Sequence, residues 1–121
     1  AHMYGNLADV NYIKRICKKM RIKILEDAAE SLGSFYNSGQ HSGTLGDIGC
    51  FSFNGNKIIT SGGGGAIISS NKKYIQLARK LINQSRSPNI EYIHSELGYK
   101  QNHRNHLFLL IYNHIFPETQ N

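Results

Sequence analysis

The strongest structural signal in this 121-residue chain is the run Phe51-Ser-Phe-Asn-Gly-Asn-Lys57, followed by Ile58-Ile-Thr-Ser61 and Gly62-Gly-Gly-Gly65. The apolar residues within 47–53 predict a buried strand, and the small polar residues after it predict a turn that carries one lysine. The four glycines indicate backbone that passes close to this turn without side chains. Their spacing matches neither the P-loop motif nor the dinucleotide-binding motif, so they are only weak evidence for nucleotide binding.

The flanking sequence alternates between helical and extended patterns. Residues from 7 onward have apolar side chains at helical spacing, with Asn6 or Asp9 as the cap, and Ile22, Ile24 and Leu25 predict a short buried strand that ends at Glu26-Asp27. Residues 34–46 read as a loop with a short hairpin, and residues 66–69 as a third strand. A second helix is expected after Asn71, with its buried face at Ile75, Leu77, Ala78, Leu81 and Ile82. This order predicts an α/β layered fold.

Two polar side chains stand at predicted strand ends, where α/β sheets bind ligands. They are Asp27 and Ser52, and Lys57 follows Ser52 by five positions. A lysine amine that condenses with a carbonyl, together with an acid that keeps a pyridine nitrogen protonated, is the minimum equipment for pyridoxal phosphate chemistry. The alternative interpretations remain a surface lysine, a turn aspartate and a strand-end serine.

Two further residues belong to the same candidate cofactor site. Ala29 lies two positions after Asp27, so in extended chain its methyl group faces the same side and can pack flat on a ring. Glu30 is placed to approach the ring hydroxyl, but an ionised carboxylate would repel a negative ring oxygen. Glu30 must therefore be protonated there or turn outward.

Composition limits the other classes of function. The formal net charge is +6, but six of the cations lie between Lys14 and Lys23 and read as the wet face of a helix. Aromatic residues are not interleaved with them, which argues against nucleic acid. The apolar run 107–112 is too short to span a membrane. The six histidines show no metal-ligand spacing, so we expect no metal.

The two cysteines and the start of the chain predict the compartment. Cys17 and Cys50 form no disulfide framework and are expected to be core thiols in a reducing compartment. No secretory signal is recognised, so a cytoplasmic location is expected. The opening residues Ala1-His-Met3 resemble a remnant of an expression tag, and the alternative is that they are native.

At several separated motifs the chain resembles the DegT-type sugar aminotransferases, which have the aspartate-aminotransferase-like (fold type I) fold. The similar segments are His2-Met-Tyr-Gly-Asn-Leu-Ala-Asp9, Leu25-Glu-Asp-Ala-Ala-Glu-Ser-Leu-Gly-Ser34, Gly46-Asp-Ile-Gly-Cys-Phe-Ser-Phe-Asn-Gly-Asn-Lys57, Ser85-Arg-Ser-Pro88 and Tyr92-Ile-His-Ser-Glu-Leu-Gly-Tyr99. The resemblance implies that Lys57 attaches pyridoxal phosphate and acts in catalysis. It further implies that Asp27 contacts the pyridinium, Ser52 the phosphate, Ala29 the ring face and Glu30 the region of the ring hydroxyl.

The resemblance also implies a reaction. Within this family, the motif sequences most resemble those of enzymes that aminate UDP-linked 4-keto-6-deoxy-N-acetyl sugars for surface polysaccharide biosynthesis. These enzymes usually take the amino group from glutamate. The partners are then a nucleotide-sugar substrate, an amino-acid donor and a second subunit of a homodimer, with no nucleic acid and no membrane. Relatives with histidine at the lysine position remove a hydroxyl instead, so Lys57 favours transamination.

Two departures from the family bear on activity. The family is roughly three times as long, and the similarity stops after Tyr99. We therefore expect residues 1–99 to be part of the large, cofactor-binding domain and residues 100–121 to be a divergent tail, such as a frameshift produces. A chain this short is expected to be too incomplete for catalysis alone and to be poorly soluble. The alternatives are an inactive remnant of such an enzyme and a basic phosphate-binding module.

Overall fold

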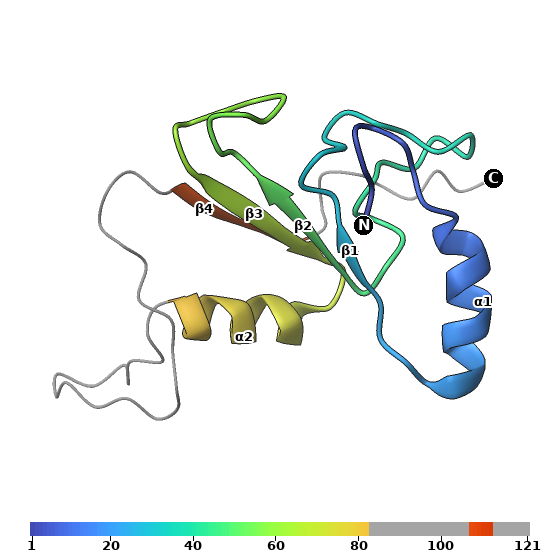
Figure 1. Ribbon diagram of the computed structural model, residues 1–121. Helices are drawn as coiled ribbons and strands as arrows, with labels where there is room; N and C mark the ends of the chain where they lie inside the picture. Colours follow the sequence, from blue (N-terminus) through green and yellow to red (C-terminus); the bar gives the residue numbers. More distant parts are fainter. Residues whose placement is uncertain (83–106, 113–121) are drawn as a thin grey trace, which may run out of the picture.

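The computed structural model describes residues 1–82 and 107–112, which form a mixed sheet with one helix packed on it and a second helix beyond the edge of the sheet (Figure 1). The four described strands lie in the order β1-β2-β3-β4, with β1 parallel to β2, β2 antiparallel to β3, and β3 parallel to β4. The elements in chain order are α1 Val10–Met20, β1 Leu25–Asp27, β2 Ile48–Ser52, β3 Gly64–Ser69, α2 Lys72–Ile82 and β4 Leu107–Tyr112. The predicted α/β class is confirmed.

Both helices begin at a side-chain cap, as predicted. The Asp9 carboxylate accepts the N–H of Tyr12 at 2.9 Å, and the Asn71 side chain accepts the N–H of Lys73 at 3.0 Å. α1 ends at Arg21, whose left-handed backbone (φ 56°) closes the last turn. No helix within the described residues is long and apolar enough to cross a membrane.

The core within the described residues is small. The buried apolar side chains come from every layer and are Val10, Ala28, Leu45, Ala66, Ile68 and Ile75. α2 packs on β3 and β4, which explains why Ile75 is buried as predicted. The cations between Lys14 and Lys23 are exposed, also as predicted.

Several predicted core positions are exposed. Ile22, Leu25 and Leu77 are 50%, 61% and 48% exposed, so the strand at 22–27 is not buried on both faces and Leu77 is not part of the buried face of α2. Cys17 and Cys50 are free but only half-buried. Apolar spacing predicted which side of each element is apolar, but it does not fix whether another element covers that side.

The loop over residues 34–46 contains the predicted short hairpin. Phe35 and His41 form an isolated antiparallel bridge, and the Tyr36 N–H donates to the Gln40 carbonyl at 2.9 Å. The loop then crosses β2 so closely that a Cβ on Gly49 would lie 2.0 Å from the Gly43 carbonyl oxygen. Only glycine at position 49 permits this approach.

Glycine serves a different purpose after Lys57 than predicted. A Cβ on Gly65 would lie 2.5 Å from the Phe51 carbonyl oxygen, so the close approach is between β3 and β2 rather than beside the lysine. Residues 54–63 form the loop between these antiparallel strands, and the Phe53 N–H donates to the Gly64 carbonyl at its base (3.0 Å).

β4 was not predicted as a strand. It is an apolar run that sequence reasoning considered only as a membrane span, and it pairs with β3 from Gly64 opposite Leu107 to Ser69 opposite Tyr112. The expected boundary after Tyr99 lies outside the described residues, as do the segment Ser85-Arg-Ser-Pro88 and four of the six histidines.

Candidate functional site

The site is built at one edge of the sheet, where two parallel strands end. Asp27 is the last residue of β1 and Ser52 the last of β2. Asp27 lies opposite Cys50, so Ser52 extends two residues further in the same direction. Parallel strands end at the same side of a sheet, and the prediction that Asp27 and Ser52 stand at strand ends is confirmed.

Lys57 lies in the loop that leaves this edge, and its amine faces an acid. Lys57 Nζ is 3.4 Å from Glu30 Oε1, and the two side chains are only 17% and 30% exposed. The other Glu30 oxygen accepts the N–H of Tyr4 at 3.2 Å, and the Glu30 carbonyl accepts the N–H of Gly5 at 2.9 Å. Glu30 is therefore fixed in place by the first residues of the chain, and it holds the Lys57 ammonium.

This contact gives a third outcome for Glu30. The sequence left two choices, a protonated Glu30 near a ring oxygen or a Glu30 turned outward. In the structure the Glu30 carboxylate instead pairs with the Lys57 amine. Its carboxylate thus keeps the lysine side chain at the sheet edge where Asp27 and Ser52 end.

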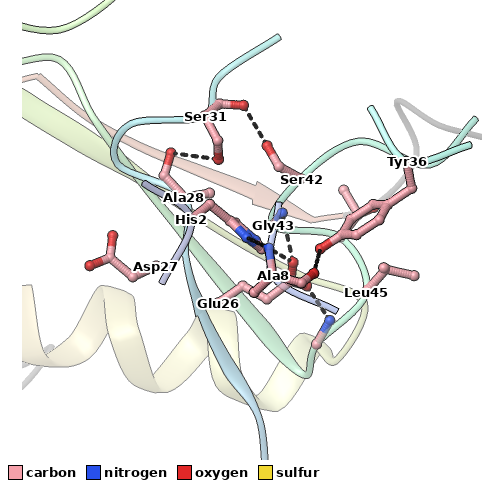
Figure 2. A network of polar contacts seen from close by, with 12 residues as sticks. His2, Ala8, Glu26, Asp27, Ala28, Ser31, Tyr36, Ser42, Gly43 and Leu45 are labelled. Carbon is pink, nitrogen blue, oxygen red and sulfur yellow. Dashed lines mark hydrogen bonds and ion pairs between the residues drawn. The ribbon is translucent and has the colours of Figure 1, made fainter. Parts of the chain in front are cut away.

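Asp27 and its neighbour Glu26 have opposite surroundings. Asp27 is exposed, and its Oδ1 accepts only the N–H of Ala29 at 3.1 Å among the described contacts. Figure 2 shows its carboxylate pointing away from the buried cluster around Glu26. Successive strand residues face opposite sides, so Asp27 retains acceptor capacity for a ligand while Glu26 faces inward.

Glu26 is the centre of a buried polar network that sequence reasoning missed (Figure 2). It is 2% exposed, and its carboxylate accepts the N–H groups of Gly43, at 2.9 Å, and of Gly46. Glu26 Oε2 also lies 3.0 Å from His2 Nε2. A buried carboxylate with three donors is fully satisfied, and it ties two distant segments to β1.

The tautomer of His2 follows from its two contacts. His2 Nδ1 accepts the N–H of Ala8 at 3.1 Å, so the proton of the neutral ring is on Nε2, which donates to Glu26. His2 is 2% exposed and stacks edge-on against Tyr36. The first residues of the chain are therefore part of the fold.

The network extends into the loop through Tyr36 and Ser42. The Tyr36 hydroxyl donates to the Ala8 carbonyl at 3.2 Å, and burial, with the negative charges of Glu26 and Asp9, raises the pKa of Tyr36 to about 12. The Ser42 hydroxyl donates to the Ser31 carbonyl at 2.6 Å. These contacts hold the loop against the end of β1 and so fix the backbone that presents Asp27.

The remaining side chains at this edge are compatible with a ligand. The Ser52 hydroxyl accepts the N–H of Asn54 at 3.3 Å and keeps its own proton for a further acceptor. Ala29 is half-buried. Burial and the nearby charge of Asp27 raise the pKa of the Cys50 thiol, which therefore stays neutral at physiological pH.

The donor set fits pyridoxal phosphate. It comprises an amine held by a carboxylate, an exposed strand-end carboxylate and a serine hydroxyl, all at one sheet edge. The structure does not bring the Asp27 and Lys57 side chains into direct contact. A cofactor that binds an amine at one end and a carboxylate at the other requires such a separation. The described residues contain no group of three or more His, Cys, Asp or Glu side chains that can hold a metal ion.

Comparison with known proteins gives a consistent family. The model of the DegT/DnrJ/EryC1/StrS aminotransferase family matches residues 1–107. EpsN of Bacillus subtilis, whose name describes a pyridoxal phosphate-dependent aminotransferase, is 47% identical over 98 residues, which are 81% of this chain and 25% of EpsN. GDP-perosamine synthase of Caulobacter vibrioides is 39% identical over 98 residues, 81% of this chain and 26% of that protein.

A solved structure has the same arrangement of elements. A DegT DnrJ EryC1 StrS aminotransferase from Brucella abortus superposes with a TM-score of 0.71 at 26% identity, over 79% of this chain and 26% of that one. The fold is therefore part of an aminotransferase fold, as predicted. The chain spans about a quarter of the length of the relatives it matches. This chain belongs to the DegT/DnrJ/EryC1/StrS aminotransferase family.

Proposed function

We propose that this chain carries the lysine-bearing part of a pyridoxal phosphate site that transfers an amino group to a nucleotide-linked keto-sugar. The observation that carries the proposal is the placement of Asp27, Ser52 and Lys57 at one sheet edge, with Lys57 held by Glu30. Family membership and the names of the relatives support the reaction class. The activity belongs to a protein that supplies the rest of the fold, because a pocket without most of its walls does not hold reactants in place.

Each residue has a distinct task in this proposal. When bound, pyridoxal phosphate supplies an aldehyde that reacts with amines and a protonated ring that accepts electrons from the substrate carbon. Lys57 would hold the group through its amine and, as a free amine, would move a proton at the substrate carbon. Asp27 would keep the ring nitrogen protonated, and Ser52 would donate a hydrogen bond to the phosphate.

Glu30 and Ala29 support the lysine and the ring. Glu30 holds the Lys57 ammonium at 3.4 Å and receives its fixed position from the Tyr4 N–H. Ala29 presents a methyl group, which leaves room for a flat ring where a larger side chain would not.

The first test is selective labelling of lysines. The full chain is incubated with pyridoxal phosphate and borohydride, and the labelled peptides are identified by mass spectrometry. Lys57 is 17% exposed and Lys23 is 69% exposed, so random chemistry favours Lys23. We expect label chiefly at Lys57 and its loss in Lys57→Ala, with Lys23→Ala as the matched control. Labelling that follows exposure would contradict the site and favour an inactive remnant.

The substrate is proposed to be a UDP-linked 4-keto-6-deoxy-N-acetyl sugar, with glutamate as donor and a homodimer as the working assembly. The name of GDP-perosamine synthase makes a GDP-linked sugar the direct competitor. The test is 2-oxoglutarate release by a protein of full family length that contains this segment. Faster release with the UDP-linked sugar is expected. Faster release with the GDP-linked sugar would overturn the choice of nucleotide, and none with either would overturn the reaction.

A basic ligand-binding module is the second candidate. A cavity of about 440 Å³ beside the end of α1 is lined by Lys14, Lys18, Arg21 and Lys23, together with Asp47 and six uncharged residues. Two of these cations are already engaged, because Lys14 Nζ donates to the Leu45 carbonyl and Lys23 pairs with Asp47, both at 2.9 Å. The negative end of the α1 dipole also disfavours an anion there. Salt-sensitive oligonucleotide binding that is lost in Lys18→Ala would favour this candidate.

A further inference from the structure

One short segment near the start of the chain contacts both ends of the candidate cofactor site. The His2 N–H donates to the Asp27 carbonyl at 2.9 Å, and the Gly5 N–H donates to the Glu30 carbonyl at 2.9 Å. Figure 1 shows this segment, in dark blue, beside the end of β1. Glu30 in turn pairs with Lys57. The same segment therefore contacts the proposed acid and the residue that holds the proposed amine.

A tight turn at Tyr4 and Gly5 orients the Glu30 carboxylate. Both residues have a positive φ, 51° at Tyr4 and 81° at Gly5, and the Asn6 N–H closes the turn on the Met3 carbonyl at 2.9 Å. The turn directs the Tyr4 N–H to Glu30 Oε2 at 3.2 Å, which leaves Oε1 for the lysine amine. A glutamate side chain has several rotamers, and a contact at each of its oxygens selects one of them.

Tyr4 is an unusual residue for this backbone conformation. Bulky side chains rarely adopt a positive φ, and such conformations concentrate at functional sites where surrounding contacts maintain them. The residue is 85% exposed, so packing of its ring contributes little to the turn. Its backbone N–H, by contrast, donates to the Glu30 carboxylate. The contribution of Tyr4 to the site is therefore the direction of its backbone N–H.

We infer that the Tyr4-Gly5 turn is a positioning element for Lys57, because it orients Glu30 and Glu30 keeps the lysine amine aligned at the sheet edge. The two turn residues act through Glu30 and do not contact the reacting atoms. The inference rests on the proposed function for the task of Lys57. It adds the residues that set the orientation of the lysine.

The test applies two amine reagents to the full chain. Acetic anhydride acetylates any accessible amine, and mass spectrometry gives the rate at Lys57 relative to Lys73, an exposed lysine of α2. Pyridoxal phosphate with borohydride instead reports an amine that is aligned in the site. A disrupted turn releases the amine from Glu30, so acetylation of Lys57 should rise while its pyridoxal phosphate label falls. Circular dichroism restricts the comparison to folded variants, since unfolding would also expose the lysine.

Gly5→Ala and Gly39→Ala are a matched pair. The two glycines have φ values of 81° and 80°, and an added Cβ would meet no atom closer than 3.6 Å at Gly5 and none within 4 Å at Gly39. Only the turn at Gly5 has a described hydrogen bond to Glu30. Gly5→Ala is expected to raise acetylation of Lys57 about 3-fold or more and to lower its pyridoxal phosphate label by about the same factor. Gly39→Ala should change each rate less than about 1.5-fold.

A second pair of variants separates the backbone of Tyr4 from its ring. Tyr4→Val and Tyr4→Asn both remove the ring and keep the N–H. A β-branched residue strongly disfavours a positive φ, whereas asparagine tolerates it. Tyr4→Val should therefore behave like Gly5→Ala, and Tyr4→Asn should behave like the unchanged chain.

The outcomes decide between a positioning turn and a turn that only supports the fold. Opposite changes of the two labels in Gly5→Ala and Tyr4→Val, absent from Gly39→Ala and Tyr4→Asn, support the inference. Unchanged labelling of Lys57 in a folded Gly5→Ala overturns it, and so does equal loss in both Tyr4 variants, which would assign the effect to the ring. If Tyr4→Val does not fold, the glycine pair decides.

Failure of the proposed function gives a different result. If pyridoxal phosphate does not select Lys57 even in the unchanged chain, the proposed cofactor site is overturned. The acetylation rates then decide alone whether the turn positions the lysine, because they do not depend on the cofactor.

Discussion

The two faces of β1 have different surroundings, although the strand is only three residues long. On one face Glu26 is 2% exposed and accepts hydrogen bonds from two loop amides and His2. On the other face Asp27 is exposed and accepts one local N–H. Strand alternation therefore separates two adjacent carboxylates into a structural acid and a candidate functional acid.

The comparison shows how a short edge strand is kept in register. Three ladder positions with β2 supply little stability, and the buried carboxylate adds contacts to segments 17 and 20 residues away. Asp27 then needs no structural partner of its own. The predictions below test this division of tasks, from the largest expected effect to the smallest.

Gly49→Ala is expected to have the largest effect, because its Cβ would lie 2.0 Å from the Gly43 carbonyl oxygen. The loop would have to move off β2, which separates Gly43 from Glu26. We expect a loss of about 3 kcal/mol or more in the free energy of unfolding, measured by urea denaturation. Gly55→Ala, whose Cβ meets no atom within 4 Å, is the control and should change stability by less than about 1 kcal/mol. Equal effects of the two variants would show that the loop does not press on β2.

Glu26→Gln is expected to cost about 2 kcal/mol of unfolding free energy. Glutamine keeps the size of the side chain but has one acceptor oxygen, so one of the Gly43 and Gly46 N–H groups is left facing a donor. Glu30→Gln removes a carboxylate from a partly exposed ion pair and should cost less than about 1 kcal/mol. The account of the buried face fails if the Glu30 variant is the less stable of the two.

Tyr36 gives the network a signature at high pH. Its pKa is raised to about 12 by burial and by the charges of Glu26 and Asp9, whereas an unfolded tyrosine titrates near 10. Deprotonation therefore favours the unfolded chain as pH rises from about 10 to about 12, and the contribution is fully present below that range. We expect Tyr36→Phe to flatten this part of the stability–pH curve, followed by circular dichroism. An unchanged slope would indicate that Tyr36 is not enclosed by the network.

Much of the fold could be predicted from local sequence. The cap at Asp9 (one of the two expected residues), the cap at Asn71, the strand within 47–53 and the short hairpin in the loop all depend on neighbouring residues, and they are confirmed. The placement of Asp27 and Ser52 at strand ends was predicted as well, and the parallel pairing of β1 and β2 puts both ends at the same edge of the sheet.

The buried network could not be predicted in this way. Glu26 is satisfied by amides far along the chain, and no spacing rule links it to His2 or Gly43. An acid one position before Asp27 in a strand, and therefore on the opposite face, was the only available signal. Likewise, the apolar spacing of Ile13, Ile16 and Met20 predicts an apolar side of α1 but does not show whether another element covers it, and these side chains are exposed in the structure.

The most direct test of the two-faced strand compares Asp27→Asn with Glu26→Gln in the same two assays, urea unfolding and borohydride labelling by pyridoxal phosphate. Asp27→Asn should keep the unfolding free energy within about 0.5 kcal/mol and lose most of the label on Lys57. Glu26→Gln should lose stability and still label Lys57 in the fraction that is folded. A destabilised Asp27→Asn that labels normally, beside a stable Glu26→Gln, would contradict the assignment of the two acids.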